Sequence, residues 1–215
     1  QPLHAFDASK IEGHEIVVRT CAEGTPFVTL DGVERKLTAN DLMICSAERP
    51  MCIAGVFGGL DSGISETTTD VFIESAYFNP VWVRKTAKRF GLNTDSSFRF
   101  ERGVDPNLQI YAAKRAALLM KELAGGTISS DITDICPVPA RDFTFDVSFA
   151  RINALIGKEL SEETVRTILD ALEVKILAEH DGVMTVAVPP YRVDVQREAD
   201  LIEDILRIYG YNNVE

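Results

Sequence analysis

The sequence lacks the segments that send a chain into or across a membrane. Its 215 residues contain no apolar run approaching the roughly 18–20 residues of a membrane-spanning helix. The start, QPLHAFDASK, has no charged region followed by an apolar stretch, so it does not resemble a signal peptide. We therefore expect a globular, cytoplasmic chain. Because it opens on Gln1 rather than Met, we also expect a piece of a longer polypeptide.

Cysteine, histidine and the common catalytic motifs are scarce. The cysteines form no CxxC pair and lie in apolar or turn contexts, which argues against a zinc site or a disulfide framework. We expect all four to be reduced core residues: Cys21, Cys45, Cys52 and Cys136. The chain has only three histidines and no GxSxG, HExxH or Walker loop. Catalysis by a Ser–His or Cys–His pair therefore has no local support.

Basic residues are outnumbered, 22 against 33 acidic residues, which gives a net charge of −11 and excludes a general polyanion binder. Residues 80–102 are the exception, with six basic and two acidic residues. Arg84 and Lys88 stand four residues apart there, so a helix would show a basic stripe suited to phosphates. A solvated helix face is the alternative. Because Phe98 and Phe100 interleave with these charges, the pattern favours a contact with nucleic acid.

The N-terminal part has the pattern of a sheet followed by helices. Short apolar segments between residues 14 and 74 predict strands, with a hairpin turn at Asp31–Gly32. Asn79 followed by a proline, and Gly91 further on, predict a helix over residues 80–90.

A second helix is predicted over residues 107–124, between Asp105–Pro106 and Gly125–Gly126. One apolar stripe runs along it and is expected in the core: Ile110, Ala113, Ala117, Met120 and Leu123. Residues 1–135 are thus predicted to form a sheet-rich domain with two helices packed on it.

The regular helix pattern ends before residue 129. Two prolines and the absence of a helical period predict a domain boundary there, with a linker over residues 136–140. Residues 141–215 read as a strand, two helices, a hairpin turning at Asp181–Gly182 and a last helix over residues 196–209. This order predicts a small winged-helix-like α+β domain, and the fold class of the whole chain is predicted to be α+β.

Two features of the first domain could form a ligand pocket. The glycine-rich run over residues 54–63 follows an apolar strand and would let the backbone approach a ligand, although a bulge with a tight turn explains it equally well. Glu74 lies in the strand pattern VFIES among apolar and aromatic neighbours. A carboxylate in that setting needs a specific partner, such as a ligand hydroxyl, unless it lies at a sheet edge or caps a helix.

The last helix carries a cluster of acids: Asp194, Asp200, Glu203 and Asp204. Like charges three and four residues apart repel, and a divalent cation held by oxygen ligands would offset the repulsion. The alternative is that Glu203 pairs with Arg207 while the other acids are solvated. Spacing alone favours this alternative.

Several motifs taken together carry a resemblance to a known family. They are QPLHAFD, GVFGG, IESAYFNP, LNTDSSFRFERGVDP and RVDVQREADLIEDILRIYGYNN. On these motifs, which cover nearly the whole chain, it resembles the beta subunit of bacterial phenylalanyl-tRNA synthetase. The resemblance implies that residues 1–135 form the editing module, which hydrolyses tyrosine wrongly attached to tRNA(Phe). Residues 141–215 would be the following small module.

The resemblance also implies roles for individual residues. It implies that Glu74 recognises the tyrosine hydroxyl, with His4 and Thr94 as further catalytic residues. It implies a pocket lined by Gly55, Gly58 and Ser96. The basic stripe of Arg84 and Lys88 would guide the tRNA acceptor end.

The resemblance further implies partners and a cofactor supplied from outside this chain. The parent enzyme would be an alpha2beta2 tetramer in which the alpha subunit carries out ATP-dependent phenylalanylation of tRNA(Phe). A magnesium ion shared with the alpha subunit would be bound at Asp194, Asp200, Glu203 and Asp204. No membrane partner is expected.

Two other interpretations remain open. In the first, the chain is a non-catalytic platform that binds tRNA and the alpha subunit. Ser96 and Ala54 support it, because the family pattern has alanine and glycine at these two positions. In the second, the winged-helix-like half binds nucleic acid as a transcription factor does, which its acidic last helix disfavours.

Overall fold

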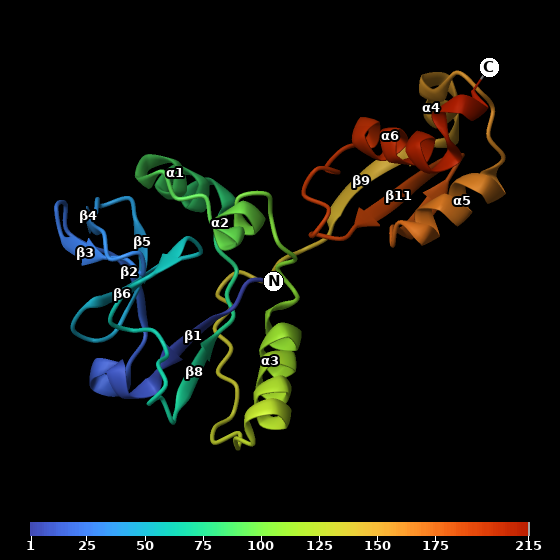
Figure 1. The fold of residues 1–215 in the computed structure, drawn as a ribbon. Coiled ribbons are helices and arrows are strands. Elements are labelled where there is room, and N and C mark those ends of the chain that lie inside the picture. Colours follow the sequence, from blue (N-terminus) through green and yellow to red (C-terminus); the bar gives the residue numbers. More distant parts are fainter. Residues whose placement is uncertain (215) are drawn as a thin grey trace. The chain divides into compact units, whose positions relative to one another are not determined.

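The computed structural model describes residues 1–214, and these divide into two compact units (Figure 1). Unit 1 comprises Gln1–Ile135, and unit 2 begins at Cys136. Both units combine helices and strands, which confirms the predicted α+β class. Among residues 1–214, no helix is long and apolar enough to cross a membrane.

Unit 1 is built on short antiparallel strands. Its largest sheet has the order β2–β5–β6–β7. The strands of this sheet are β2 (Val17–Thr20), β5 (Leu42–Cys45), β6 (Pro50–Ile53) and β7 (Phe57–Gly58). A separate hairpin pairs β3 (Pro26–Val28) with β4 (Glu34–Lys36). It turns at the predicted position, where Gly32 has a φ of 74° that favours glycine.

A second two-stranded ladder joins the beginning of unit 1 to the end of its strand region. Strand β1 (His4–Asp7) runs antiparallel to β8 (Val71–Glu74), and His4 lies directly opposite Glu74. The sequence analysis did not predict β1, because its pairing partner lies far along the chain. This ladder nevertheless places the two most important polar side chains of the unit side by side.

Helix α1 (Pro80–Phe90) confirms the predicted start and stop signals. The Asn79 side chain accepts a hydrogen bond from the Val81 amide at 2.9 Å, and Gly91 closes the helix with a φ of 67°. The helix is tied to the sheet region through the buried carboxylate of Asp41. Thr86 donates to this carboxylate at 2.9 Å, and Arg89 forms an ion pair with it.

Helix α2 (Asp95–Phe100) is a short helix that the sequence analysis did not predict. It begins with a capping box: the Thr94 side chain accepts from the Ser97 amide at 3.0 Å, and the Ser97 hydroxyl accepts from the Thr94 amide at 3.1 Å. Unit 1 therefore has three helices rather than the predicted two.

Helix α3 (Gln109–Ala124) corrects the prediction of a core stripe. None of its residues is buried, and Leu123 is 81% exposed. The helix lies beside β8, and the Ser75 hydroxyl donates to the Gln109 carbonyl at 2.8 Å. The apolar spacing correctly identified residues on one face of a helix. The two-stranded β1–β8 ladder is too narrow to bury that face.

Unit 2 is a three-stranded antiparallel sheet with helices, in the strand order β10–β11–β9. Its strands are β9 (Phe143–Ser148), β10 (Lys175–His180) and β11 (Val183–Val188), and its helices are α4 (Phe149–Ile156), α5 (Glu162–Ala171) and α6 (Glu198–Tyr209). The hairpin turns at the predicted Asp181–Gly182, and Ile202 and Ile205 of the last helix are buried. Short 3-10 segments complete the described chain at Ala8–Lys10, Glu12–His14 and Tyr211–Asn213.

The cysteines are free thiols, but they are not all core residues. Cys45 and Cys52 are buried, whereas Cys21 is half-buried and Cys136 is exposed. The prediction was wrong for Cys136 because it lies in the exposed segment that follows α3, where no sheet or helix covers it.

Candidate functional site

Unit 1 contains a cavity of about 270 Å³, close to the lower end of the range for small-molecule sites. It is lined by apolar residues and by a few polar side chains that converge on it. The lining residues are Pro2, Leu3, His4, Leu30, Cys52, Gly55, Val56, Phe57, Gly58, Glu74, Phe78, Thr94, Asp95, Ser96 and Phe100. All six residues that the sequence analysis assigned to a pocket are in this set. They come from β1, β7, β8, α2 and the loops around them.

Two carboxylates of residues 1–214 line this cavity, Glu74 from strand β8 and Asp95 from helix α2. Burial raises the pKa of Glu74 to about 7, although the amide of Ala76 hydrogen-bonds the carboxylate and partly offsets this effect. Its Oε1 is buried and has no hydrogen-bond partner in residues 1–214. A buried oxygen without a partner is costly, so this side chain is poised for a polar ligand atom.

His4 faces the same cavity from the opposite strand. Burial lowers the pKa of its imidazole, so the ring is neutral near pH 7. The ring packs against that of Phe6, with 4.3 Å between the ring centroids. Its Nε2 is the other buried side-chain polar atom without a partner in the described chain. Two residues that line the cavity therefore each have one buried polar atom without a partner in residues 1–214.

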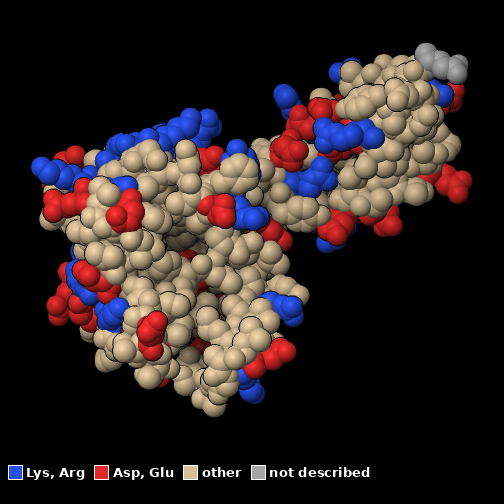
Figure 2. Space-filling model, in the orientation of Figure 1, with Lys and Arg blue, Asp and Glu red and all other residues tan. Residues whose placement is uncertain are grey.

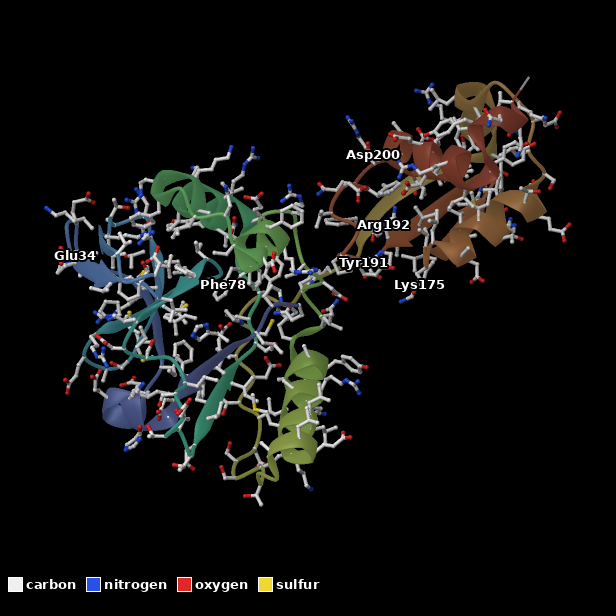
Figure 3. All side chains as sticks on the ribbon, in the orientation of Figure 1. Glu34, Phe78, Lys175, Tyr191, Arg192 and Asp200 are labelled. Atoms are coloured by element: carbon white, nitrogen blue, oxygen red, sulfur yellow. The ribbon has the colours of Figure 1, made fainter. Side chains whose placement is uncertain are left out.

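Two glycines keep the cavity open. A side chain at Gly55 would place its Cβ 2.9 Å from Phe78 and 3.1 Å from Phe100, and the backbone there has a φ of 69°. A Cβ at Gly58 would lie 2.8 Å from the His4 ring. Phe78, labelled in Figure 3, is buried, and its ring meets that of Phe100 edge to face. Glycine is needed at both positions for these aromatic and imidazole rings to keep their places.

Thr94 and Ser96 hold the backbone that forms the cavity wall. The Thr94 hydroxyl donates to the Val56 carbonyl at 2.7 Å, and the Ser96 hydroxyl donates to the Gly55 carbonyl at 2.9 Å. Their hydroxyl protons are thus engaged within the protein. Both residues fix the glycine-containing loop in place, which makes them positioning residues in this geometry.

The sequence analysis missed Cys52 as a lining residue. The thiol lies in the same cavity as His4, which raises the question of a Cys–His nucleophile. Burial, together with the charge of Glu74, raises the Cys52 pKa far above the usual range. The Sγ atom lies 3.5 Å from the carbonyl oxygens of Ile53 and Phe57. The thiol is therefore held protonated and is unsuited to nucleophilic attack.

The basic stripe of α1 is exposed, as Figure 2 shows by the blue side chains gathered over this helix. Arg84, Lys85 and Lys88 form no ion pair with any of residues 1–214, whereas Arg89 is engaged with Asp41. The predicted pair Arg84 and Lys88 thus lies on a solvent-facing surface. Its role in tRNA binding stays a prediction.

The acids of the last helix are mostly engaged with arginines. Asp204 is buried and pairs with Arg192 and Arg207. The remaining pairs are Glu203 with Arg207 at 2.8 Å and Asp200 with Arg197 at 3.1 Å. The Arg197 hydrogen bond lowers the pKa of Asp200. Figure 3 shows Asp200 and Arg192 at separate places in unit 2.

Asp194, Asp200, Glu203 and Asp204 do not converge into a metal site. Within residues 1–214 there is no group of three or more potential metal ligands. The arginine pairs neutralise three of the four carboxylates, so the donor set offered by residues 1–214 does not fit magnesium.

Comparisons with known proteins agree with the division into two units. The B3/4 domain family matches residues 1–125, which contain the whole cavity. The chain belongs to the B3/4 domain family. A second match, to the tRNA synthetase B5 domain, covers residues 145–211. The B3/4 domain thus supplies His4 and Glu74, and the B5 domain supplies the acidic helix.

The curated relatives share one name. The phenylalanine–tRNA ligase beta subunits of Bacteroides fragilis (strain YCH46), Porphyromonas gingivalis and Geobacter sulfurreducens are 66%, 59% and 47% identical to this chain. Each alignment covers 100% of this chain but only 26–27% of the relative, so the chain spans about a quarter of their length. These matches confirm the predicted resemblance to that family.

The comparison with solved structures also returned a match. It is an N-terminal fragment of the phenylalanyl-tRNA synthetase beta subunit from Pyrococcus horikoshii, with 17% identity and a TM-score of 0.49. The alignment covers 97% of this chain and 60% of that one.

The raised pKa of Glu74 predicts a pH-dependent stability. Between pH 4.5 and about 7 the folded protein keeps a proton that the unfolded chain releases, so stability falls as pH rises through this window. We expect wild type to lose roughly 2–3 kcal/mol relative to Glu74→Gln between pH 4.5 and pH 8. Urea unfolding at several pH values measures this difference. The exposed Glu66→Gln variant should follow wild type, and a stability difference between wild type and Glu74→Gln that is constant with pH would contradict the assignment.

The crowding at Gly55 predicts that Gly55→Ala lowers the free energy of unfolding by more than the strain of a positive φ would alone. Gly125 has the same φ of 69° with open space around it, so Gly125→Ala should cost roughly 1–2 kcal/mol. Gly55→Ala should cost about 1–3 kcal/mol more, because its Cβ meets Phe78 and Phe100. The denaturant midpoints of the two variants test this prediction. Equal losses of stability would show that Phe78 and Phe100 can move aside without measurable cost.

The arginine pairing of the acidic helix predicts that this chain binds magnesium poorly by itself. We expect the melting temperature to be unchanged by millimolar magnesium or by a chelator. Thermal unfolding followed by circular dichroism measures this directly. A stabilisation by magnesium that Asp194→Asn abolishes would reverse the conclusion.

Proposed function

We propose that the B3/4 domain hydrolyses the ester between tyrosine and tRNA(Phe), as a post-transfer editing site of a phenylalanine–tRNA ligase. The observation that carries the proposal is that one largely apolar cavity is lined by two residues with an unpartnered buried polar atom each, Glu74 Oε1 and His4 Nε2. An aromatic amino acid with one hydroxyl has the matching chemistry. Phe78 and Phe100 offer it ring contacts, and Glu74 offers an acceptor for the hydroxyl.

The physical logic is that of a second sieve. The amino-acid pocket at which a ligase attaches phenylalanine to tRNA cannot strongly reject tyrosine, which differs only by an added hydroxyl. A second pocket whose buried carboxylate needs that hydroxyl can reject the analogue without it, because the carboxylate would otherwise stay unpaired. Glu74 would therefore retain tyrosine and release phenylalanine.

Hydrolysis itself requires a positioned water and donors for the developing oxyanion. The neutral imidazole of His4 can orient the ester end or the water through Nε2. Thr94 and Ser96 would act indirectly, by fixing the loop that carries Gly55 and Val56. The protonated Cys52 takes no part as a nucleophile.

The wider context also belongs to this proposal. We propose that the chain works in the cytoplasm, inside an alpha2beta2 enzyme whose alpha subunit forms phenylalanyl-tRNA(Phe) with ATP. Arg84 and Lys88 would steer the tRNA acceptor end toward the cavity. A magnesium site at the acidic helix would need ligands from the alpha subunit, since residues 1–214 do not assemble one.

The alternative function is a platform that binds tRNA and the alpha subunit without catalysis. Ser96 supports it, because its hydroxyl narrows the wall where the family pattern has alanine. The Ser96 proton is donated to the Gly55 carbonyl, however, so the hydroxyl adds little demand for a partner inside the cavity. We therefore favour the editing function.

The deciding experiment is calorimetric titration of this chain with free tyrosine and free phenylalanine. We expect tyrosine to bind more tightly and Glu74→Gln to weaken it by roughly 10- to 100-fold, the range for losing a hydrogen bond to a charged group. Because the ionised carboxylate is the stronger acceptor, tyrosine affinity should rise with pH through about 7.

Controls separate the possible outcomes. The exposed Glu66→Gln variant should bind tyrosine as wild type does. Equal affinity for tyrosine and phenylalanine would contradict selection by Glu74. Binding of neither amino acid would favour the non-catalytic function. An unchanged rate of tyrosyl-tRNA(Phe) hydrolysis by the whole enzyme carrying His4→Ala would exclude the role given to His4.

A further inference from the structure

Helix α2 presents two different surfaces within one turn. Asp95, Ser96 and Phe100 line the cavity, whereas Phe98 lies outside it and is 56% exposed. The helical rise places Phe98 only about 4.5 Å along the axis from Asp95. A solvent-facing aromatic ring therefore stands immediately beside the cavity lining.

The guanidinium group of Arg102 lies over this ring, and we call the two side chains the Phe98–Arg102 stack. Its guanidinium carbon lies 3.6 Å from the centroid of the Phe98 ring. Two hydrogen bonds hold the guanidinium in place, to the Phe98 carbonyl at 3.0 Å and to the Glu101 carboxylate at 2.8 Å. The Arg102 side chain is itself 55% exposed. The stack is thus ordered by the protein and open to solvent.

Helix α1, which packs against α2, is basic in an otherwise acidic chain, whereas the two acids of residues 80–102, Asp95 and Glu101, lie at α2. Residues 80–102 carry six basic and two acidic side chains against a total of −11 for the chain. Helix α1, which packs against α2, contributes Arg84, Lys85 and Lys88. No ion pair with the rest of residues 1–214 neutralises these three side chains. They would attract phosphates to this side of the cavity.

We propose that the Phe98–Arg102 stack is a binding platform for the unpaired base at the 3′ end of an RNA whose esterified amino acid occupies the cavity. Unpaired bases are bound by stacking on aromatic rings and on guanidinium planes, and both are present here in one unit. The proposal rests on the proposed editing function, because that function requires an RNA terminus at the cavity. It names the residues that hold this terminus.

The platform has a direct test with a fluorescent RNA. The probe is an RNA stem-loop with a short unpaired 3′ end whose last nucleotide is 2-aminopurine, titrated with this chain. Stacking of the terminal base should quench the fluorescence. We expect Phe98→Ala to weaken binding about tenfold or more, the range for losing one base–aromatic stack, and to abolish the quenching.

Matched variants separate stacking from charge and from folding. Phe98→Tyr should keep both affinity and quenching, whereas Phe98→Leu should lose quenching despite its apolar bulk. Tyr111→Ala removes a more exposed aromatic residue on α3, 67% against 56% for Phe98, and should bind RNA as wild type does. Arg84→Ala with Lys88→Ala should reduce the salt dependence of binding without abolishing quenching at saturating RNA.

The outcomes also distinguish this proposal from the editing function. Titration with free tyrosine involves no RNA, so Phe98→Ala should bind tyrosine as wild type does even while RNA binding falls. Loss of tyrosine selectivity with intact quenching would contradict the editing function and leave base binding by the Phe98–Arg102 stack supported. Wild-type affinity and quenching in Phe98→Ala, or no RNA binding by wild type, would overturn the role of the Phe98–Arg102 stack, whatever the result of the tyrosine titration.

Discussion

The pairing of β1 with β8 is the constraint on which the site depends. It sets His4 directly opposite Glu74 and turns both side chains toward a cavity where each keeps one polar atom unpartnered. Each such atom would be expected to cost about 1–3 kcal/mol, so the surrounding unit must stabilise the arrangement. The densely packed cluster that includes Phe6 and Ile53 supplies this stabilisation from neighbouring strands.

The walls of the cavity are as important as its two polar groups. Gly55 and Gly58 leave room that a methyl group would fill, and the hydroxyls of Thr94 and Ser96 fix the same loop through its carbonyls. Burial then shifts the pKa values of Glu74 and His4 in opposite directions, toward the neutral form of each. Near pH 7 the His4 imidazole is therefore uncharged, and the Glu74 carboxyl is close to the midpoint of its titration.

The two units differ in how far their charged side chains are paired within the protein. In the B3/4 domain, Arg84, Lys85 and Lys88 of α1 form no ion pair within residues 1–214 and are exposed to an anionic partner. In the B5 domain, arginines neutralise the acids of α6, including the buried Asp204. These ion pairs explain why spacing that suits a metal in the sequence gives no metal cluster among the described residues.

The sequence by itself determined the features that local chemistry decides. Caps at Asn79 and Gly91, the turns at Gly32 and Gly182 and the α+β class followed from nearby residues, because caps and turns need only local backbone geometry. Tertiary structure alone decided the rest. No local pattern could reveal that β1 pairs with β8, and periodicity could not tell that nothing in unit 1 buries Leu123 on α3, because both depend on segments distant in the chain.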